Sequence, residues 1–212
     1  MQYKIALAGS SKYTVMMATA LQTDQRFTIS YTISPSPKPI GRQQIFSKNP
    51  LQLWAEKFQL TNFTVAKKID ENLQEQLRSA EEIDFLLVVD FGYLIPSRLL
   101  QLAKIAPLNI HPSLLPKWRG SSPGQFALLL QKLAGETTQS AITLMVMNEG
   151  LDQGPIIAQL PFDIKENWTQ NEYYEQAFTL MAEKLGDLIS DYAQGKIIAQ
   201  TQAIESPTIT AK

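Results

Sequence analysis

Two short segments of the chain carry the side chains best suited to chemistry. The first runs from Asn109 to Gly120 and contains His111, the only histidine among 212 residues. The second is the run Glu149–Gly154, in which Asp152 lies between two glycines. An amide can donate to a developing oxyanion, an imidazole can relay a proton, and a carboxylate can fix the tautomer of the imidazole. These are the groups needed to move an acyl group from one nitrogen to another.

Each of these residues also has an ordinary structural interpretation. A single histidine beside a strand end is usually structural or exposed, and Asn109 can simply satisfy backbone groups there. Asp152, flanked by glycines, has the composition of a common loop. The run Ser113–Pro116 fits a turn with two packing leucines. Their chemistry therefore depends on whether the fold brings them together.

Alternating strand and helix patterns surround the two segments. Continuous apolar runs predict buried strands at Ile5–Ala8 and Ile83–Val89. Further strands are expected at Phe27–Ile33, Ser140–Met147 and Ile156–Phe162, and helices at Thr14–Leu21, Pro50–Phe58 and Leu73–Ala80. This alternation predicts an α/β fold with a doubly wound, mostly parallel, Rossmann-like sheet. Ligands bind such sheets at the carboxyl ends of strands, which is where Asp90–Pro96 and Asn109–Pro116 are expected.

Capping residues predict where the other elements begin and end. Ser122 and Pro123 favour the start of a helix that Gly135 ends. The final helix is expected to begin at Thr169, with Glu172 completing a capping box, and to end at Gly195. Residues 201–212 have the pattern of a linker or tail. The run Ser34–Arg42 has three alternating prolines, which predict an exposed loop without helix or sheet hydrogen bonds.

Composition limits the class of protein. A chain with 44% hydrophobic and 18% charged residues is globular and long enough for one large domain. The net charge of −1 gives no overall basic field for nucleic acid. The absence of cysteine excludes disulfides and thiolate catalysis, and one histidine excludes a histidine-rich metal site. No apolar run reaches the ~20 residues that span a bilayer, so a soluble cytoplasmic protein without membrane contact is expected.

The two chemical segments also carry a family resemblance. The runs N-I-H-P-S-L-L-P-K-W-R-G and E-G-L-D-Q-G resemble those of the folate-dependent formyltransferases. The continuation W-R-G-S-S-P-x-Q is most similar to the branch of that family that formylates methionyl-tRNA. The resemblance implies a catalytic domain over residues 1–200 and a linker or tail over 201–212, without the C-terminal barrel domain of that branch. It further implies a monomer that uses 10-formyltetrahydrofolate and initiator methionyl-tRNA and requires no metal.

The resemblance assigns roles to individual residues. It implies that Asn109 binds the formyl oxygen and that His111 and Asp152 complete the catalytic group. It implies a folate pocket that is formed by two runs, Val89, Asp90, Phe91, Gly92, Tyr93, Leu94, Ile95 and Pro96, and Ser113, Leu114, Leu115 and Pro116. Relatives commonly have a small residue where this chain has Asp90. For the tRNA it implies contacts from Lys38, Gly41 and Arg42 in a P-x-G-R loop, and from Tyr13 at the pocket for the methionyl side chain.

Two other functions remain open from the sequence. The same chemistry suits a small amine acceptor, such as a sugar nucleotide or glycinamide ribonucleotide. Alternatively, the fold can persist as a non-catalytic module that binds folate or RNA. The P-x-G-R loop favours tRNA, whereas the near-zero net charge and the lack of a barrel domain weaken that preference. The presence of Asn109, His111 and Asp152 together argues against loss of catalysis.

Overall fold

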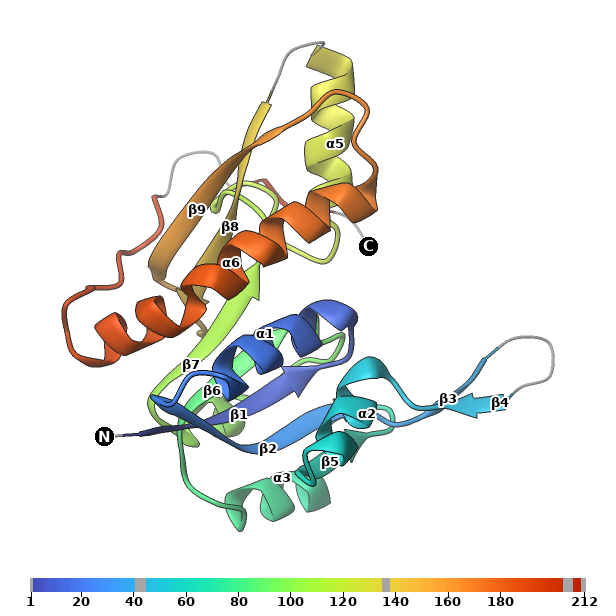
Figure 1. Ribbon diagram of the computed structural model, residues 1–212, viewed down its shortest axis with the longest axis vertical. Helices are drawn as coiled ribbons and strands as arrows, with labels where there is room; N and C mark the ends of the chain where they lie inside the picture. The colour runs from blue at the N-terminus through green and yellow to red at the C-terminus, as the bar shows by residue number, and fades with distance from the viewer. Residues whose placement is uncertain (1, 41–44, 135–137, 204–207, 211–212) are drawn as a thin grey trace. The chain divides into compact units, whose positions relative to one another are not determined.

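The computed structural model describes residues 2–40, 45–134, 138–203 and 208–210 (Figure 1). Among these residues, seven strands form one sheet in the spatial order β5 (Thr61–Val65), β2 (Phe27–Pro35), β1 (Tyr3–Gly9), β6 (Ile83–Val89), β7 (Ala103–His111), β8 (Thr138–Val146) and β9 (Ile156–Ile164). The predicted doubly wound, mostly parallel α/β class is confirmed. The chain divides into two compact units, Met1–Leu108 and Asn109–Lys212, and β7 carries the chain from one to the other.

The first unit is built on parallel strands with apolar residues on both faces. Strand β1 pairs in parallel with β2 and β6, and β2 pairs in parallel with β5. Residues Ile5–Ala8 are fully buried, as expected for a central parallel strand. Helices α1 (Lys12–Gln22) and α2 (Pro50–Lys57) pack together and against β2. The unit also contains α3 (Glu71–Arg78) and α4 (Ser97–Leu100).

A two-stranded ribbon stands apart from the main sheet in the first unit (Figure 1). It consists of β3 (Lys38–Ile40) and β4 (Ile45–Ser47), which pair antiparallel. The prediction that the prolines of Ser34–Arg42 prevent sheet hydrogen bonding is therefore wrong for Lys38–Ile40. It is also wrong for Ser34 and Pro35, which end β2 and pair with β5. In an antiparallel pair every second residue directs its N–H away from the partner strand, so Pro39 is tolerated opposite Phe46. Lys38 is exposed, as predicted.

The second unit packs a long helix against an antiparallel hairpin. Strands β8 and β9 pair antiparallel, and α6 (Gln170–Ala193) lies along both of them (Figure 1). Five residues of α6 are fully buried at helical spacing, namely Tyr173, Ala177, Met181, Leu185 and Ile189. The helix begins with the predicted capping box between Thr169 and Glu172. Gly195 follows its C-cap with a positive φ of 73°, which confirms the predicted end.

The segment after α6 returns along the second unit. Gln200 pairs with Ile156 in an antiparallel bridge, and Ile209 pairs with Arg119 in a parallel bridge. The division into a domain over residues 1–200 and a linker or tail over 201–212 stays a prediction. Helix α5 (Pro123–Ala134) starts at the expected Pro123, whereas Gly135, its predicted end, lies outside the described residues. No described helix is both long and apolar enough to cross a membrane.

The capping box of α6 gives a test of this part of the fold. We expect Thr169→Ala to lower the free energy of unfolding by about 1 kcal/mol, because the Glu172 N–H loses its side-chain acceptor. Thr179→Ala, at an exposed position inside the same helix, is the matched control and should cost nothing, since alanine favours helix. Denaturant titration measures both. Equal effects of the two substitutions would contradict the assignment of the cap.

Candidate functional site

Asn109 and His111 are positioned by the end of a buried strand. They are the last alternating pair of β7, so their side chains leave the strand on the same side. Leu108 precedes this pair and Ile110 lies between its two members. Both are buried, and their burial fixes the orientation of the pair. Pro112 follows directly, and the chain leaves the strand there. Two polar side chains are thus presented side by side where the strand ends.

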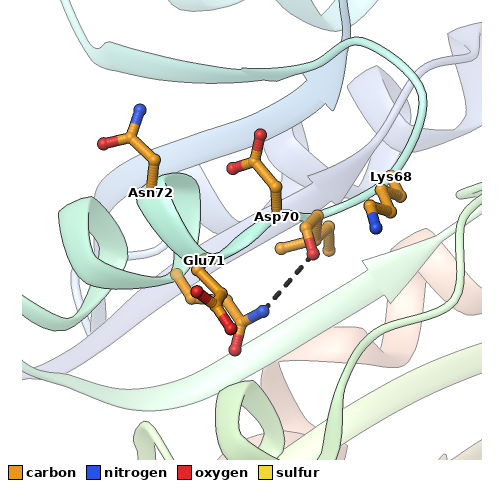
Figure 2. Close-up of a pocket in the computed structure, with 6 residues that line it drawn as sticks. Lys68, Asp70, Glu71 and Asn72 are labelled. Atoms are coloured by element: carbon orange, nitrogen blue, oxygen red, sulfur yellow. Dashed lines mark hydrogen bonds between the residues drawn. The ribbon is translucent and has the colours of Figure 1, made fainter.

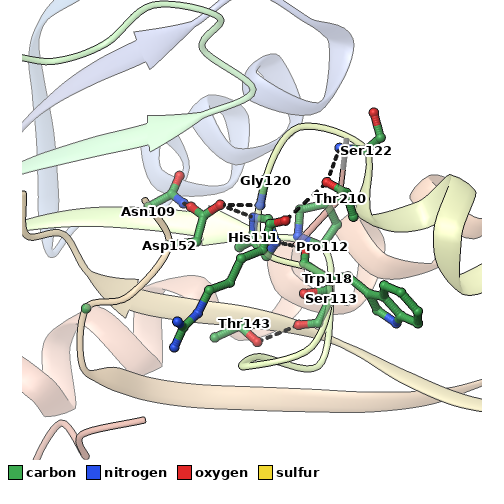
Figure 3. A network of polar contacts seen from close by, with 12 residues as sticks. Asn109, His111, Pro112, Ser113, Trp118, Gly120, Ser122, Thr143, Asp152 and Thr210 are labelled. Atoms are coloured by element: carbon green, nitrogen blue, oxygen red, sulfur yellow. Dashed lines mark hydrogen bonds and ion pairs between the residues drawn. The ribbon is translucent and has the colours of Figure 1, made fainter. Parts of the chain in front are cut away.

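The carboxylate of Asp152 completes a group of three side chains within the second unit (Figure 3). Its Oδ1 accepts from the Asn109 amide at 3.4 Å, and its Oδ2 lies 3.7 Å from Nδ1 of His111. The Gly120 N–H donates to the same Oδ2 at 2.8 Å. The structure therefore brings together three residues that the sequence separates by up to 43 positions.

The proton of His111 is assigned by its second contact. Nε2 lies 2.9 Å from the carbonyl oxygen of Trp118. A carbonyl can only accept, so Nε2 must carry a hydrogen in this arrangement. Nδ1 then faces the carboxylate of Asp152, either with a lone pair or, in the imidazolium, with a second N–H. Nδ1 is therefore the nitrogen left for chemistry.

Burial strengthens the electrostatics of this group. The side chains of His111 and Asp152 are 6% and 11% exposed. A carboxylate removed from water requires compensating donors, and Asp152 receives them from Asn109 and from the backbone of Gly120. Asp152 itself adopts a left-handed backbone conformation with φ of 51°. Such a conformation persists in a non-glycine residue only where its surroundings hold it.

Side chains of the second unit hold the loop that follows His111. Thr143 Oγ1 donates to the Ser113 carbonyl at 2.6 Å, and Ser113 Oγ donates to the Lys117 carbonyl at 2.7 Å. The Gln159 amide donates to the Leu115 carbonyl at 2.9 Å. Ser113 and Leu115 are buried, and Leu114 and Pro116 are half-buried. The predicted folate-binding run Ser113–Pro116 is therefore a fixed loop that begins two residues after His111.

Tyr173 anchors the first turn of the same loop. Its hydroxyl donates to the Pro112 carbonyl at 2.9 Å and lies 2.6 Å from Ser140 Oγ. Burial raises the pKa of this hydroxyl well above its ordinary value, so it stays protonated and remains a donor at neutral pH. Helix α6 thus connects to the residue directly after His111 through one buried hydrogen bond.

The second predicted folate-binding run, Val89–Pro96, lies in the first unit at the end of β6. Val89 and Ile95 are buried, whereas Asp90, Gly92 and Leu94 are exposed. Asp90 has a left-handed φ of 50°, and its carbonyl accepts from Ser10 Oγ at 3.2 Å. The rings of Phe91 and Tyr93 lie with centroids 5.5 Å apart. The run therefore presents main-chain groups and aromatic faces after a strand end, and its binding role stays a prediction.

The residues predicted to contact tRNA fall partly outside the described chain. Lys38 Nζ lies 5.9 Å from the ring centroid of Tyr93, within the first unit. Tyr13, in the first turn of α1, is half-buried, and its ring lies 5.0 Å from Lys12 Nζ. Gly41 and Arg42 lie outside the described residues. The role of these four residues in tRNA binding stays a prediction.

A pocket elsewhere in the first unit holds none of the predicted site residues (Figure 2). It surrounds the start of α3 and is lined by Lys68, Ile69, Asp70, Glu71, Asn72 and Gln74. Asp70 uses its carboxylate to cap α3, where it accepts from the Leu73 N–H. The Gln74 amide donates to the Ile69 carbonyl at 3.4 Å. These polar groups serve the start of the helix, which accounts for them without a ligand.

Several groups at the site carry no signal in the sequence. The Trp118 carbonyl and the Gly120 N–H are backbone groups, which every residue type supplies. Thr143 and Gln159 lie in strands whose pattern indicates only burial. Gln202 belongs to the predicted tail, yet its amide donates to the Asp152 carbonyl. Among the described residues, no group of three or more His, Cys, Asp or Glu side chains is arranged to hold a metal ion.

Comparisons of the sequence with known proteins identify relatives of one kind. The model of the formyl transferase family matches residues 3–185. The methionyl-tRNA formyltransferase of Ehrlichia ruminantium (strain Gardel) is 35% identical over 164 residues, covering 77% of this chain and 52% of that protein. The corresponding protein of Listeria monocytogenes is 29% identical over 206 residues, covering 97% of this chain and 63% of the relative. The chain thus spans about half to three fifths of the length of these curated relatives.

Solved structures resemble the fold at lower sequence identity. The structure of phosphoribosylglycinamide formyltransferase from Anaplasma phagocytophilum matches this fold with a TM-score of 0.74. The two sequences are 19% identical, and the match covers 99% of each chain. An N-formyltransferase from Helicobacter canadensis, in complex with folinic acid and dTDP-3-aminofucose, has a TM-score of 0.71 and 18% identity. That match covers 99% of this chain and 71% of the other. At these identities the likeness establishes the fold.

The Tyr173 anchor gives a test of how the site is held. We expect Tyr173→Phe to lower the free energy of unfolding by about 1–3 kcal/mol, because the buried Pro112 carbonyl and the Ser140 hydroxyl lose their partner. Tyr174→Phe, at the half-buried neighbouring position, is the control and should cost less. Thermal and denaturant unfolding measure both. A Tyr173→Phe variant as stable as the wild type would refute the anchoring role.

Proposed function

The chain belongs to the formyl transferase family, and from that premise we propose that it transfers a formyl group from 10-formyltetrahydrofolate to the α-amino group of initiator methionyl-tRNA. The observation that carries the proposal is the convergence of Asn109, His111 and Asp152 in one unit. The choice of acceptor is supported by the similarity to methionyl-tRNA formyltransferases over 77% and 97% of the chain.

Asn109 is proposed to stabilise the charge that develops on the formyl oxygen. Attack by the neutral amine turns the formyl carbon tetrahedral and places negative charge on that oxygen. The Asn109 amide is held by a long contact of 3.4 Å to Asp152, which a new acceptor can replace at little cost. A preorganised donor at the oxyanion lowers the activation barrier by ~3 kcal/mol, which raises the rate ~10²-fold.

His111 is proposed to act through Nδ1. Its Nε2–H is engaged by the Trp118 carbonyl, and this bond fixes the plane of the ring. A cationic imidazole directs Nδ1–H toward the space beside Asp152, where it can donate to the oxyanion or protonate the leaving nitrogen. The burial of the ring keeps water from competing for the same hydrogen.

Asp152 is proposed to orient the other two residues and to receive the proton that the attacking amine releases. Its Oδ2 faces the imidazole and is also bound by the Gly120 N–H, whereas Oδ1 contacts only Asn109 among the described residues. When the formyl oxygen takes the Asn109 amide, Oδ1 becomes available as a base, directly or through one water. The chemistry then proceeds without a metal ion.

The formyl donor is proposed to contact two loops of this chain. Val89–Pro96 and Ser113–Pro116 offer main-chain N–H and C=O groups to the edge of a pterin ring and apolar side chains to its faces. The related N-formyltransferase with folinic acid supports a folate as the donor. The exposed carboxylate of Asp90 adds a negative charge to the Val89–Pro96 run.

The tRNA is proposed to contact the ribbon of β3 and β4. Lys38 is exposed in that ribbon, and Gly41 and Arg42 follow it in the sequence. Cations in such an arm can contact phosphates of an acceptor end. Tyr13 is proposed to contact the methionyl side chain.

The catalytic roles predict large losses of rate. We expect Asn109→Ala and His111→Ala each to reduce formyl transfer by ~10²-fold or more, because each substitution removes a proposed donor to the developing oxyanion. The assay offers 10-formyltetrahydrofolate with charged initiator methionyl-tRNA, glycinamide ribonucleotide or an amino sugar nucleotide. Lys196→Ala, at an exposed ion pair with Asp191, is the control and should retain full activity.

The same assay identifies the acceptor. Transfer to methionyl-tRNA alone supports the proposal, whereas transfer to a small amine replaces it with the small-acceptor function. A wild-type protein that binds folate but formylates none of the three would point to a binding module. Near-normal turnover of a folded His111→Ala variant would remove that residue from the mechanism.

The tRNA contact predicts a change in salt dependence. We expect Arg42→Ala to raise the KM for methionyl-tRNA and to leave folate affinity unchanged. The slope of log affinity against log salt should fall by about one unit, since one phosphate contact is lost. Binding titrations across a salt series measure this, with Lys57→Ala on α2 as a charge-matched control. Coincident curves for wild type and Arg42→Ala would exclude the contact.

A further inference from the structure

A buried glutamine of the C-terminal segment uses its whole side-chain amide within the second unit. Gln202 is 6% exposed. Its Nε2 donates to the carbonyls of Asp152 and Gly154, both at 2.9 Å. Its Oε1 accepts from Arg119 Nη2 at 2.7 Å and from Arg119 Nε at 3.2 Å. Both N–H groups and the oxygen are thus bound, which is uncommon for a residue of a merely trailing segment.

Gln202 is bonded to the backbone of Asp152 at a turn where that residue has an uncommon conformation. Asp152 has φ of 51°, a region that favours glycine. The Asp152 and Gly154 carbonyls converge on the two hydrogens of one amide, which fixes the turn between them. Gly154 packs so closely against the Val146 carbonyl that no side chain fits there. The turn that carries the Asp152 carboxylate is therefore bonded to a residue 50 positions later.

Gln202 also reaches the other side of that carboxylate through Arg119. The residue after Arg119 is Gly120, whose N–H donates to Asp152 Oδ2. The residue before it is Trp118, whose carbonyl binds His111 Nε2. Arg119 is further held by its backbone, which pairs with Thr208 and Thr210 at 2.9 and 2.7 Å. Figure 3 shows Thr210 beside Gly120 and Ser122 in this network.

We propose that Gln202 is a positioning residue for formyl transfer, which acts by clamping the Asp152 turn to the Trp118–Gly120 backbone so that the carboxylate keeps its distance and angle to His111. This inference rests on the proposed function. Gln202 touches no reacting atom in this arrangement. Its amide is neutral, so it fixes the geometry of the carboxylate and of the imidazole without adding charge beside them.

The first test removes either the two N–H donors of Gln202 alone or the whole side-chain amide. Gln202→Glu keeps an acceptor for Arg119 but cannot donate to the two carbonyls, and Gln202→Ala removes both halves. We expect both variants to lower kcat by about 10- to 100-fold with little change in KM, as for a misplaced catalytic group. Gln200→Ala is the control, because that side chain is exposed and only its backbone is bonded. Wild-type kcat in folded Gln202→Ala would overturn the proposal.

The second test asks whether Gln202 acts through Asp152. In an Asp152→Asn background, adding Gln202→Ala should lower kcat much less than it does in the wild type, because the group that it positions is already impaired. A structural role alone would lower stability and the active fraction by the same factor in both backgrounds. Equal factors in the two backgrounds would therefore overturn the inference.

The third readout does not require activity. His111 is the only histidine, so its imidazole ¹⁵N signals are unambiguous. We expect the wild type to show Nε2 protonated, the Gln202 variants to show displaced signals, and Gln200→Ala to match the wild type. If the wild type formylates no acceptor, the proposed function fails and these spectra still decide the positioning role. Unchanged signals in both folded Gln202 variants would overturn it.

Discussion

The buried carboxylate of Asp152 is the constraint on which the second unit depends. A carboxylate with 11% exposure needs donors, and these come from separate segments, the Asn109 amide and the Gly120 N–H, while the His111 imidazole faces the same group. Each donor must be delivered by an element that ends in the right place. The strand end at His111 and the loop to Gly120 satisfy this condition, and the same contacts create the arrangement that suits acyl transfer.

Side chains, not regular secondary structure, hold the loop between His111 and Gly120. Thr143, Gln159 and Tyr173 each bind one of its carbonyls from β8, β9 and α6. A loop fixed by buried hydrogen bonds has little freedom to reorganise during a reaction. This matters because donors stabilise a developing charge best when they are already in place. The packing of α6 on the hairpin and the geometry at His111 are therefore parts of one arrangement.

Local patterns predicted much of the fold. The run Ile83–Val89 was recognisable as a central strand because uninterrupted apolar residues suit a strand that is buried on both faces. The capping box at Thr169 was recognisable because its two partners lie three residues apart. The ribbon at Lys38–Ile40 was missed, since whether a proline disrupts pairing depends on which way its nitrogen faces. That direction is a property of the pair of strands, which one run of residues does not contain.

The sequence by itself determined which chemical groups are present: one imidazole, an amide two residues before it, and a carboxylate between glycines. It also determined that the first two lie on one side of a strand end, because alternation along a strand is local. Only the tertiary structure decided that the Trp118 carbonyl sets the protonated nitrogen of His111 and that Gln202 holds the left-handed turn at Asp152. The physical reason is that backbone groups have no residue type, and contacts across 50 positions arise only when the chain has folded.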